Sequence, residues 1–87
     1  MSAEQTHSQP VKSHQVDARR LLCPLPVIRT QDAAAKLQTG ELLTVTSTDP
    51  GAKMDIPCWC RINGHEVIEI KEQEHEIIIT IKVNQEG

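Results

Sequence analysis

A cysteine followed by two alternating prolines is the feature of this sequence with the clearest chemical meaning. The segment Cys23-Pro24-Leu25-Pro26 stands directly before a stretch with helical periodicity. A thiol placed ahead of a helix faces free backbone N–H groups and the positive end of the helix dipole, which favour the thiolate form. Pro24 suits the first helical position and keeps Cys23 extended. The segment therefore predicts an outward-pointing, nucleophilic thiol at Cys23.

The alternative for Cys23 is a small buried side chain, which free cysteine often is. Burial would leave no reason for Pro24 and Pro26 to shape the chain around the thiol, so the functional interpretation is favoured. A thiolate here could attack a persulfide, take its outer sulfur and later release it to another nucleophile. We expect its pKa to lie only modestly below the ordinary value of about 8.5, because both prolines lack an N–H and leave Leu25 and Val27 as the nearest donors.

The other two thiols of the chain lie in Cys58-Trp59-Cys60. Residues two apart on a helix point to different sides, and this pair lacks the Cys-x-x-Cys spacing of oxidoreductases. Helical periodicity places Cys60 with Ile56 and Trp59 on a buried face and Cys58 on the opposite, exposed face. Cys58 is then either an incidental surface thiol or an accessory sulfur acceptor. Zinc bound by the three cysteines and a histidine matches no common ligand spacing, so no metal and no cofactor are expected.

The composition indicates one small cytoplasmic domain. The chain has 87 residues, 9 basic against 12 acidic side chains and a net charge of −3, which is too little positive charge for stable direct binding to nucleic acid. No segment resembles a signal peptide or a membrane span. The odd number of cysteines favours free thiols over structural disulfides. Residues 1–13 are polar and aperiodic, which predicts a disordered tail before a single domain at 14–87.

Hydrophobic periodicity predicts four strands and two helices in the order β-α-β-α-β-β. Apolar residues alternate in the strands and recur every three or four residues in the helices. Two helices covering one face of a four-stranded mixed sheet would bury these residues, giving an α/β protein of the α+β two-layer sandwich type. The predicted ranges are 14–19, 24–38, 42–48, 53–62, 66–71 and 76–83.

Particular residues set the expected helix ends and the inward face of the last strands. Gly40 is expected to cap the first helix. The second helix is expected to start near Met54, which puts Pro57 in its first turn, where a missing N–H has no effect. In the hairpin that closes the chain, inward positions are assigned to Ile68, Ile70, Ile77, Ile79, Ile81 and Val83.

The sequence resembles the TusA/SirA family of small sulfur carriers over about residues 14–83. The resemblance rests on residues 17–26, which contain Cys-Pro-Leu-Pro, and on the motifs Gly40-Glu41, Asp49-Pro50 and Asp55-Ile56-Pro57. It implies the two-layer sandwich and a persulfide carried on Cys23. Family members usually have glycine where this chain has Arg20, so a turn that needs positive φ would be strained there.

The resemblance implies a carrier that receives sulfur from a cysteine desulfurase or rhodanese-like donor protein and relays it to an acceptor protein. The family's acceptors serve tRNA thiolation, molybdenum-cofactor assembly or sulfur oxidation, and nothing in the sequence selects among them. Such a sulfurtransferase-type relay needs partner proteins, and the carrier itself is expected to be a monomer. The alternative is a non-catalytic regulatory or adaptor domain, or a thiol redox sensor, in which Cys23 never accumulates bound sulfur.

Charged residues near the second predicted helix are candidates for partner docking, as similar positions are in the family. The alternative is an ordinary solvated helix face. These candidates are Lys53, Asp55 and Arg61. The four histidines are scattered and are interpreted as surface residues: His7, His14, His65 and His75.

Overall fold

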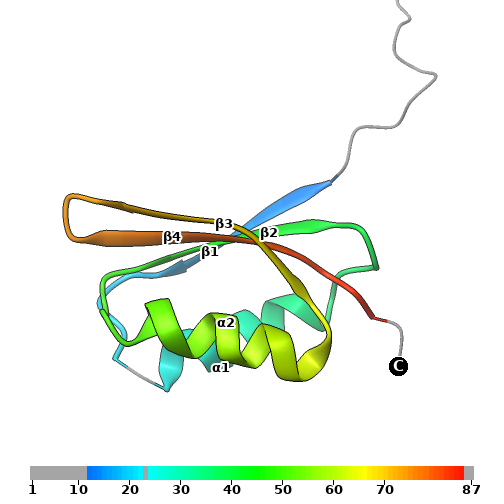
Figure 1. The fold of residues 1–87 in the computed structure, drawn as a ribbon, viewed down its shortest axis with the longest axis horizontal. Coiled ribbons are helices and arrows are strands. Elements are labelled where there is room, and N and C mark those ends of the chain that lie inside the picture. The colour runs from blue at the N-terminus through cyan, green and yellow to red at the C-terminus, as the bar shows by residue number, and fades with distance from the viewer. Residues whose placement is uncertain (1–11, 23, 86–87) are drawn as a thin grey trace, which may run out of the picture.

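The computed structural model of this protein describes residues 12–22 and 24–85. The order of elements is the predicted β-α-β-α-β-β (Figure 1). The tail predicted for residues 1–13 lies outside the described residues except for Lys12 and Ser13, and Ser13 begins the first strand. Within the described ranges, no helix is long and apolar enough to cross a membrane. The elements are β1 (Ser13–Ala18), α1 (Leu25–Ala34), β2 (Leu42–Ser47), α2 (Ala52–Asn63), β3 (Glu66–Gln73) and β4 (Glu76–Lys82).

The strands form one mixed sheet in the order β1-β2-β4-β3. β1 and β2 are parallel, whereas β4 pairs antiparallel with both β2 and β3. Both helices lie on the same face of this sheet (Figure 1). The parallel strands β1 and β2 have their C-terminal ends at the same end of the sheet, so the helices that follow them also begin there. The predicted two-layer sandwich is therefore confirmed, and it brings the N-terminal ends of α1 and α2 to the same end of the sheet.

Helix α1 forms because residues four apart bury one face against the sheet. Pro26, Thr30 and Ala34 make this face, and all three are buried. The Thr30 hydroxyl donates a hydrogen bond to the Pro26 carbonyl at 2.7 Å, so its polar group is satisfied inside the core. Val27 and Leu37 are partly buried against the same core.

The predicted range 24–38 was too long for α1, which ends at Ala34. Beyond it the chain continues in tighter turns, in which Lys36 and Leu37 donate to carbonyls three residues back. Gly40 is therefore not the helix cap. Its φ of 97° serves the turn that leads into β2, a conformation that glycine adopts without steric cost.

Helix α2 begins earlier than predicted, at Ala52 rather than near Met54, and Pro57 lies inside it. The early start is possible because the first turn is tight. The N–H groups of Ala52, Lys53 and Met54 donate to carbonyls three residues back. Pro57, inside the helix, has no N–H to donate to the carbonyl four residues back. At the other end Gly64 adopts φ 82° and caps the helix.

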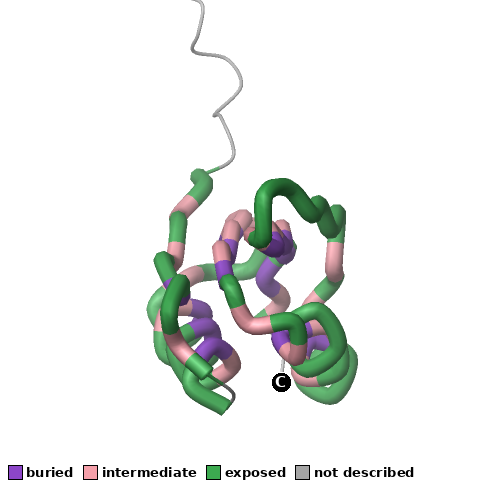
Figure 2. Tube along the Cα trace, turned by 90° about the vertical axis from the view of Figure 1, so that its left-hand side faces the viewer, coloured by how far each residue is buried: buried purple, intermediate pink, exposed green. Residues whose placement is uncertain are grey.

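The core lies between the sheet and the two helices, where purple segments gather in Figure 2. β4 crosses its middle, and the predicted inward residues Ile77, Ile79 and Ile81, with Val83 directly after the strand, are all buried. β2 supplies alternate residues, as predicted, and α2 supplies one stripe. The residues of the core are Ala18, Ala34, Leu43, Val45, Ala52, Ile56, Cys60, Ile77, Ile79, Ile81 and Val83.

Ile68 and Ile70, both assigned to the inward face, are not buried and remain 50% and 39% exposed. β3 is an edge strand that pairs only with β4, and a register shift between Val67 and Glu69 interrupts the alternation. Val67 packs against the core instead. Ile70 pairs with Ile79 and so lies on the helix-covered face, but at the edge of the sheet it remains partly open to solvent.

Candidate functional site

Cys23 itself lies outside the described residues, so the site is defined by the chain on either side of it. Leu22 is 72% exposed and Pro24 is exposed. The Leu25 N–H donates to the Leu22 carbonyl at 2.9 Å, which ties the residue before Cys23 to the first residue of α1. The positions that flank the cysteine are therefore held at the entrance of α1 and open to solvent.

Pro24 and Pro26 take different positions at the start of α1. Pro24 is the N-cap residue of α1, one position earlier than predicted, with φ −94° and ψ 12° and no capping side chain. Pro26 is buried at the second helical position, where its missing N–H would have had no partner inside the helix. The prediction also named the Leu25 N–H as a donor for the sulfur. That N–H is already given to Leu22, which removes one of the two donors named.

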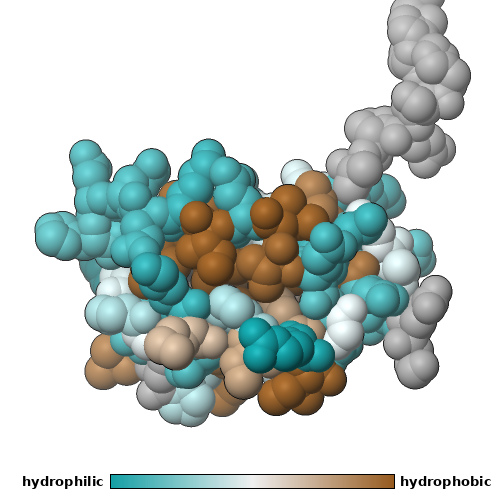
Figure 3. Space-filling view, viewed as in Figure 1, coloured by the Kyte–Doolittle hydropathy of each residue, from teal (hydrophilic) through white to brown (hydrophobic). Residues whose placement is uncertain are grey.

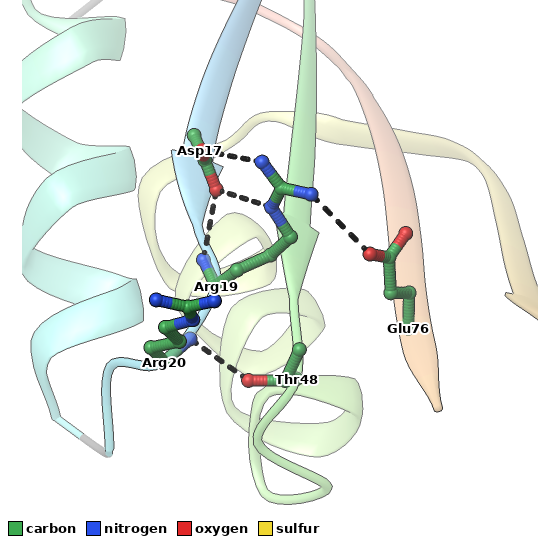
Figure 4. A pocket seen from close by; sticks show the side chains of 5 residues that line it. All are labelled: Asp17, Arg19, Arg20, Thr48 and Glu76. Atoms are coloured by element: carbon green, nitrogen blue, oxygen red, sulfur yellow. Dashed lines mark hydrogen bonds and ion pairs between the residues drawn. The ribbon is translucent and has the colours of Figure 1, made fainter. Parts of the chain in front are cut away.

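Arg20 adopts φ 68° in the turn between β1 and position 23. This is the left-handed conformation whose strain the sequence predicted for a residue larger than glycine. The Arg20 N–H donates to the Thr48 hydroxyl at 2.9 Å, which joins the turn after β1 to the end of β2 (Figure 4).

The neighbouring Arg19 pairs with two carboxylates of the same chain. Its Nε and Nη2 each lie 2.9 Å from a carboxylate oxygen of Asp17, and its Nη1 lies 3.5 Å from Glu76 (Figure 4). Hydrogen bonds from the Arg19 side chain and backbone lower the pKa of Asp17 to about 2. The same partners raise the pKa of Arg19. Together with Arg20 and Thr48, these residues line a depression of about 490 Å³.

The three charged docking candidates do not form one surface. All are exposed, but Lys53 and Asp55 lie in the first turn of α2, whereas Arg61 lies in its last turn. Eight residues of helix separate Lys53 from Arg61 by about 12 Å along the axis. Lys53 also forms an ion pair with Glu72 of β3. Only Lys53 and Asp55 lie near the end of the sheet where α1 begins.

The two described thiols occupy opposite faces of α2, as the periodicity indicated. Cys58 is exposed and Cys60 is buried. Burial raises the pKa of the Cys60 thiol to about 11, because the charged form loses its hydration. His65 is half-buried beside Trp59, with ring centroids 4.9 Å apart, and its Nδ1 accepts a hydrogen bond from the Asn84 N–H. It is therefore not the plain surface histidine that was expected.

Exposed apolar residues at the entrances of both helices were missed by the sequence argument. Leu22, Leu25 and Ile28 flank the start of α1, and Met54 stands in the first turn of α2, all at least 45% exposed. The helical period indicated their exposure, since Leu25, Ile28 and Met54 do not fall on the buried faces of α1 and α2. Further apolar surface is seen over β3 and on the outer side of the helix layer (Figure 3).

Comparison with known proteins agrees with this arrangement. The profile of the family described as "Sulfurtransferase TusA" matches residues 14–83. The Bacillus subtilis protein YrkI is 43% identical over 60 residues, covering 68% of this chain and 80% of YrkI. The sulfur carrier protein TusA of Allochromatium vinosum is 34% identical, covering 78% of this chain and 90% of that protein.

A solved structure shares the fold. The crystal structure of a SirA-like protein from Desulfitobacterium hafniense superposes with a TM-score of 0.74 at 27% identity, covering 82% of this chain and 97% of the other. The family match spans the segment around Cys23, both helices and the four strands. The chain belongs to the TusA family.

Proposed function

We propose that this protein is a cytoplasmic sulfur carrier that accepts a persulfide sulfur on Cys23 and relays it to an acceptor protein. The observation that carries the proposal is the entrance of α1, where exposed residues on both sides of Cys23 are tied together by the hydrogen bond from Leu25 to Leu22. Relatives that bear the name sulfur carrier protein TusA support the same role.

The proposed transfer is an exchange at sulfur that needs no external oxidant. The Cys23 thiolate attacks the outer sulfur of a persulfide on the donor protein. A bond forms between Cys23 and that sulfur, the bond between the two donor sulfurs breaks, and the donor cysteine leaves as a thiolate. In the second step a nucleophile of the acceptor takes the outer sulfur from Cys23, and the Cys23 thiolate is regenerated.

The donor is proposed to be a cysteine desulfurase or a rhodanese-like protein, and the acceptor to serve tRNA thiolation, molybdenum-cofactor assembly or sulfur oxidation. The carrier is proposed to act as a monomer without stable nucleic-acid binding, in line with its net charge of −3. Lys53 and Asp55 lie at the end of the sheet where α1 begins, so these two residues, rather than Arg61, are the proposed docking candidates. Cys58, on the outer face of α2, is proposed to be dispensable for loading.

Intact-mass spectrometry after incubation with a sulfur donor tests the proposal. With a cysteine desulfurase and free cysteine, or a rhodanese and thiosulfate, the wild type should gain the mass of one sulfur on the peptide that contains Cys23. Cys23→Ser should abolish this gain, and the matched variant Cys58→Ser should retain it. If Cys23→Ser loads normally while Cys58→Ser does not, the site is wrong. If the wild type never gains sulfur, the regulatory or redox-sensing alternative is favoured.

The role of the prolines is tested separately, by the double variant Pro24→Ala/Pro26→Ala. We propose that the prolines aim the thiol and hardly alter its acidity, because the Leu25 N–H is already used by Leu22. Transfer to the acceptor should therefore slow more than the pKa of Cys23 changes. Thiolate absorbance against pH, measured beside transfer rates, separates the two effects. Unchanged transfer in the double variant would remove the mechanical role.

A further inference from the structure

The backbone of Arg20 is held in an unfavourable conformation. Its φ of 68° lies in the left-handed region, which glycine adopts freely and larger residues do not. The guanidinium makes no ion pair or hydrogen bond with any residue in 12–22 or 24–85. A strained residue with an unused charged side chain is a sign of a role outside the fold.

The position of Arg20 is nevertheless well defined. Its N–H donates to the Thr48 hydroxyl at 2.9 Å, so the turn is fixed to the end of β2. Its side chain lines the same depression as Asp17, Arg19 and Glu76 (Figure 4). The guanidinium is therefore presented from a fixed backbone, which reduces the ordering cost of a contact with a partner.

The comparison with Arg19 isolates what is special about Arg20. Both arginines are exposed, and they are adjacent in sequence. Arg19 satisfies Asp17 with two bonds and also approaches Glu76. Two carboxylates therefore balance the charge of Arg19, whereas Arg20 acts on Asp17 only through space and its guanidinium remains available at the surface.

Exposed apolar side chains follow Arg20 along the chain. Leu22, two residues further along the chain, is 72% exposed, and Leu25 is 45% exposed. Apolar side chains with an arginine at their margin are typical of protein contact surfaces, and arginine is enriched among residues that dominate binding. This apolar surface also flanks Cys23, where the proposed sulfur exchange takes place.

We propose that Arg20 determines which protein exchanges sulfur with Cys23, by pairing its guanidinium with a carboxylate on the donor protein. The inference rests on the proposed sulfur-carrier function. A guanidinium forms two parallel hydrogen bonds with a carboxylate, so one arginine is sufficient for such a contact. A small free oxoanion such as thiosulfate fits less well, because it would leave the exposed Leu22 and Leu25 side chains uncovered.

The test compares Arg20→Gly with Arg19→Gln, two variants that each remove one positive charge from neighbouring positions. The rate of sulfur loading on Cys23 is measured by mass spectrometry with the persulfidated donor protein that loads the wild type, either a desulfurase or a rhodanese. A second arm uses inorganic polysulfide, which needs no protein docking. Arg20→Gly should load about tenfold more slowly from the protein and at the wild-type rate from polysulfide. Arg19→Gln should stay within about twofold of the wild type in both arms.

Two further readouts distinguish docking from a structural role. Raising the ionic strength should slow loading of the wild type from the donor protein and have less effect on Arg20→Gly. The thermal midpoint of Arg20→Gly should not fall, because glycine relieves the left-handed strain.

The outcomes separate this inference from the function on which it rests. Equal loading of Arg20→Gly and wild type from the donor protein would overturn the inference. A loss in the polysulfide arm as well would also overturn it, since Arg20 would then act on the thiol itself. A wild type that loads from neither source would overturn the sulfur-carrier function.

Discussion

Helix α2 carries two apolar stripes with identical spacing, of which one is buried and the other is exposed to solvent. In each stripe three residues follow one another at intervals of four, so their spacing does not distinguish them, and Trp59 beside Ile56 and Cys60 is the residue that marks the inward side. The sheet decides, because only one stripe faces β3 and β4. The buried stripe is Ala52, Ile56 and Cys60, and the exposed stripe is Met54, Cys58 and Ile62.

The comparison shows that apolar residues on this helix serve different purposes. The buried stripe contributes to folding by removing apolar surface from water. The exposed stripe contributes little to stability. Met54, at its first position, lies at the end of the sheet where α1 also begins. Each stripe holds one thiol, so the difference can be measured both as stability and as chemical reactivity.

The largest expected effect comes from shortening the side chain in the middle of the buried stripe. Ile56 is fully buried, so Ile56→Ala should lower the free energy of unfolding by about 3 kcal/mol, through lost burial and a residual cavity. The matched variant Ile62→Ala, on the exposed stripe at 77% exposure, should change it by less than about 0.5 kcal/mol. Urea unfolding curves measure both. Similar losses in the two variants would contradict the assignment of the stripes.

Thiol reactivity should separate the stripes next. Burial raises the pKa of Cys60 to about 11, so at pH 8 only about one molecule in a thousand carries its thiolate. Cys58 is exposed, and an alkylating reagent reaches it without any opening of the fold. In the folded protein Cys58 should therefore be labelled at least about 100-fold faster than Cys60. Peptide mapping of a labelling time course would decide, and equal rates would show that α2 is rotated from the position described.

Much of this arrangement could be read from the sequence, because strands and helices leave different periods in it. Alternation located β2 and β4 and their inward residues, and intervals of three and four residues placed Thr30 and Ala34 on the inward face of α1. The failures arose where a neighbouring element, rather than the local pattern, sets the environment. Ile68 and Ile70 alternate like core residues, yet they lie on an edge strand that carries a bulge.

The site was partly predictable for the same reason. The alternating prolines marked the entrance of α1. The sequence also indicated that a turn with positive φ would be strained at Arg20, and the structure has φ 68° there. The engagement of Arg19 was not predictable. Its partner Glu76 lies 57 positions away in sequence, and the contact depends on the end of β1 and the start of β4 lying on either side of β2. The role of Cys23 itself stays a prediction.

A smaller effect is expected from replacing the buried thiol. Cys60→Ala should lower the free energy of unfolding by about 1 kcal/mol, because it removes one buried sulfur and leaves a small cavity. Cys58→Ala should change it by less than about 0.5 kcal/mol. Neither variant should alter sulfur loading on Cys23. A larger loss in Cys58→Ala than in Cys60→Ala, measured by urea unfolding, would reverse the assignment of the two thiols.

The smallest effect is expected at the C-terminal end of the buried stripe, where the His65 N–H donates to the Cys60 carbonyl. The His65 ring packs beside Trp59, and burial lowers its pKa below the ordinary value of 6.5. The unfolded chain therefore takes up a proton at a higher pH than the native protein does. The stabilising contribution of neutral His65 should be complete above about pH 6.5 and be lost as the pH falls below that value.

The geometry around His65 suggests the variant that tests this dependence. Protonation of Nδ1 would break the hydrogen bond that this atom accepts from the Asn84 N–H at 2.9 Å. In His65→Asn the amide oxygen can accept the same bond but does not titrate. Urea midpoints measured from pH 7.5 to pH 5 should therefore fall less in the variant than in the wild type. Because the other histidines are present in both proteins, the difference reports His65 alone, and parallel curves would show that the end of the stripe does not respond to pH.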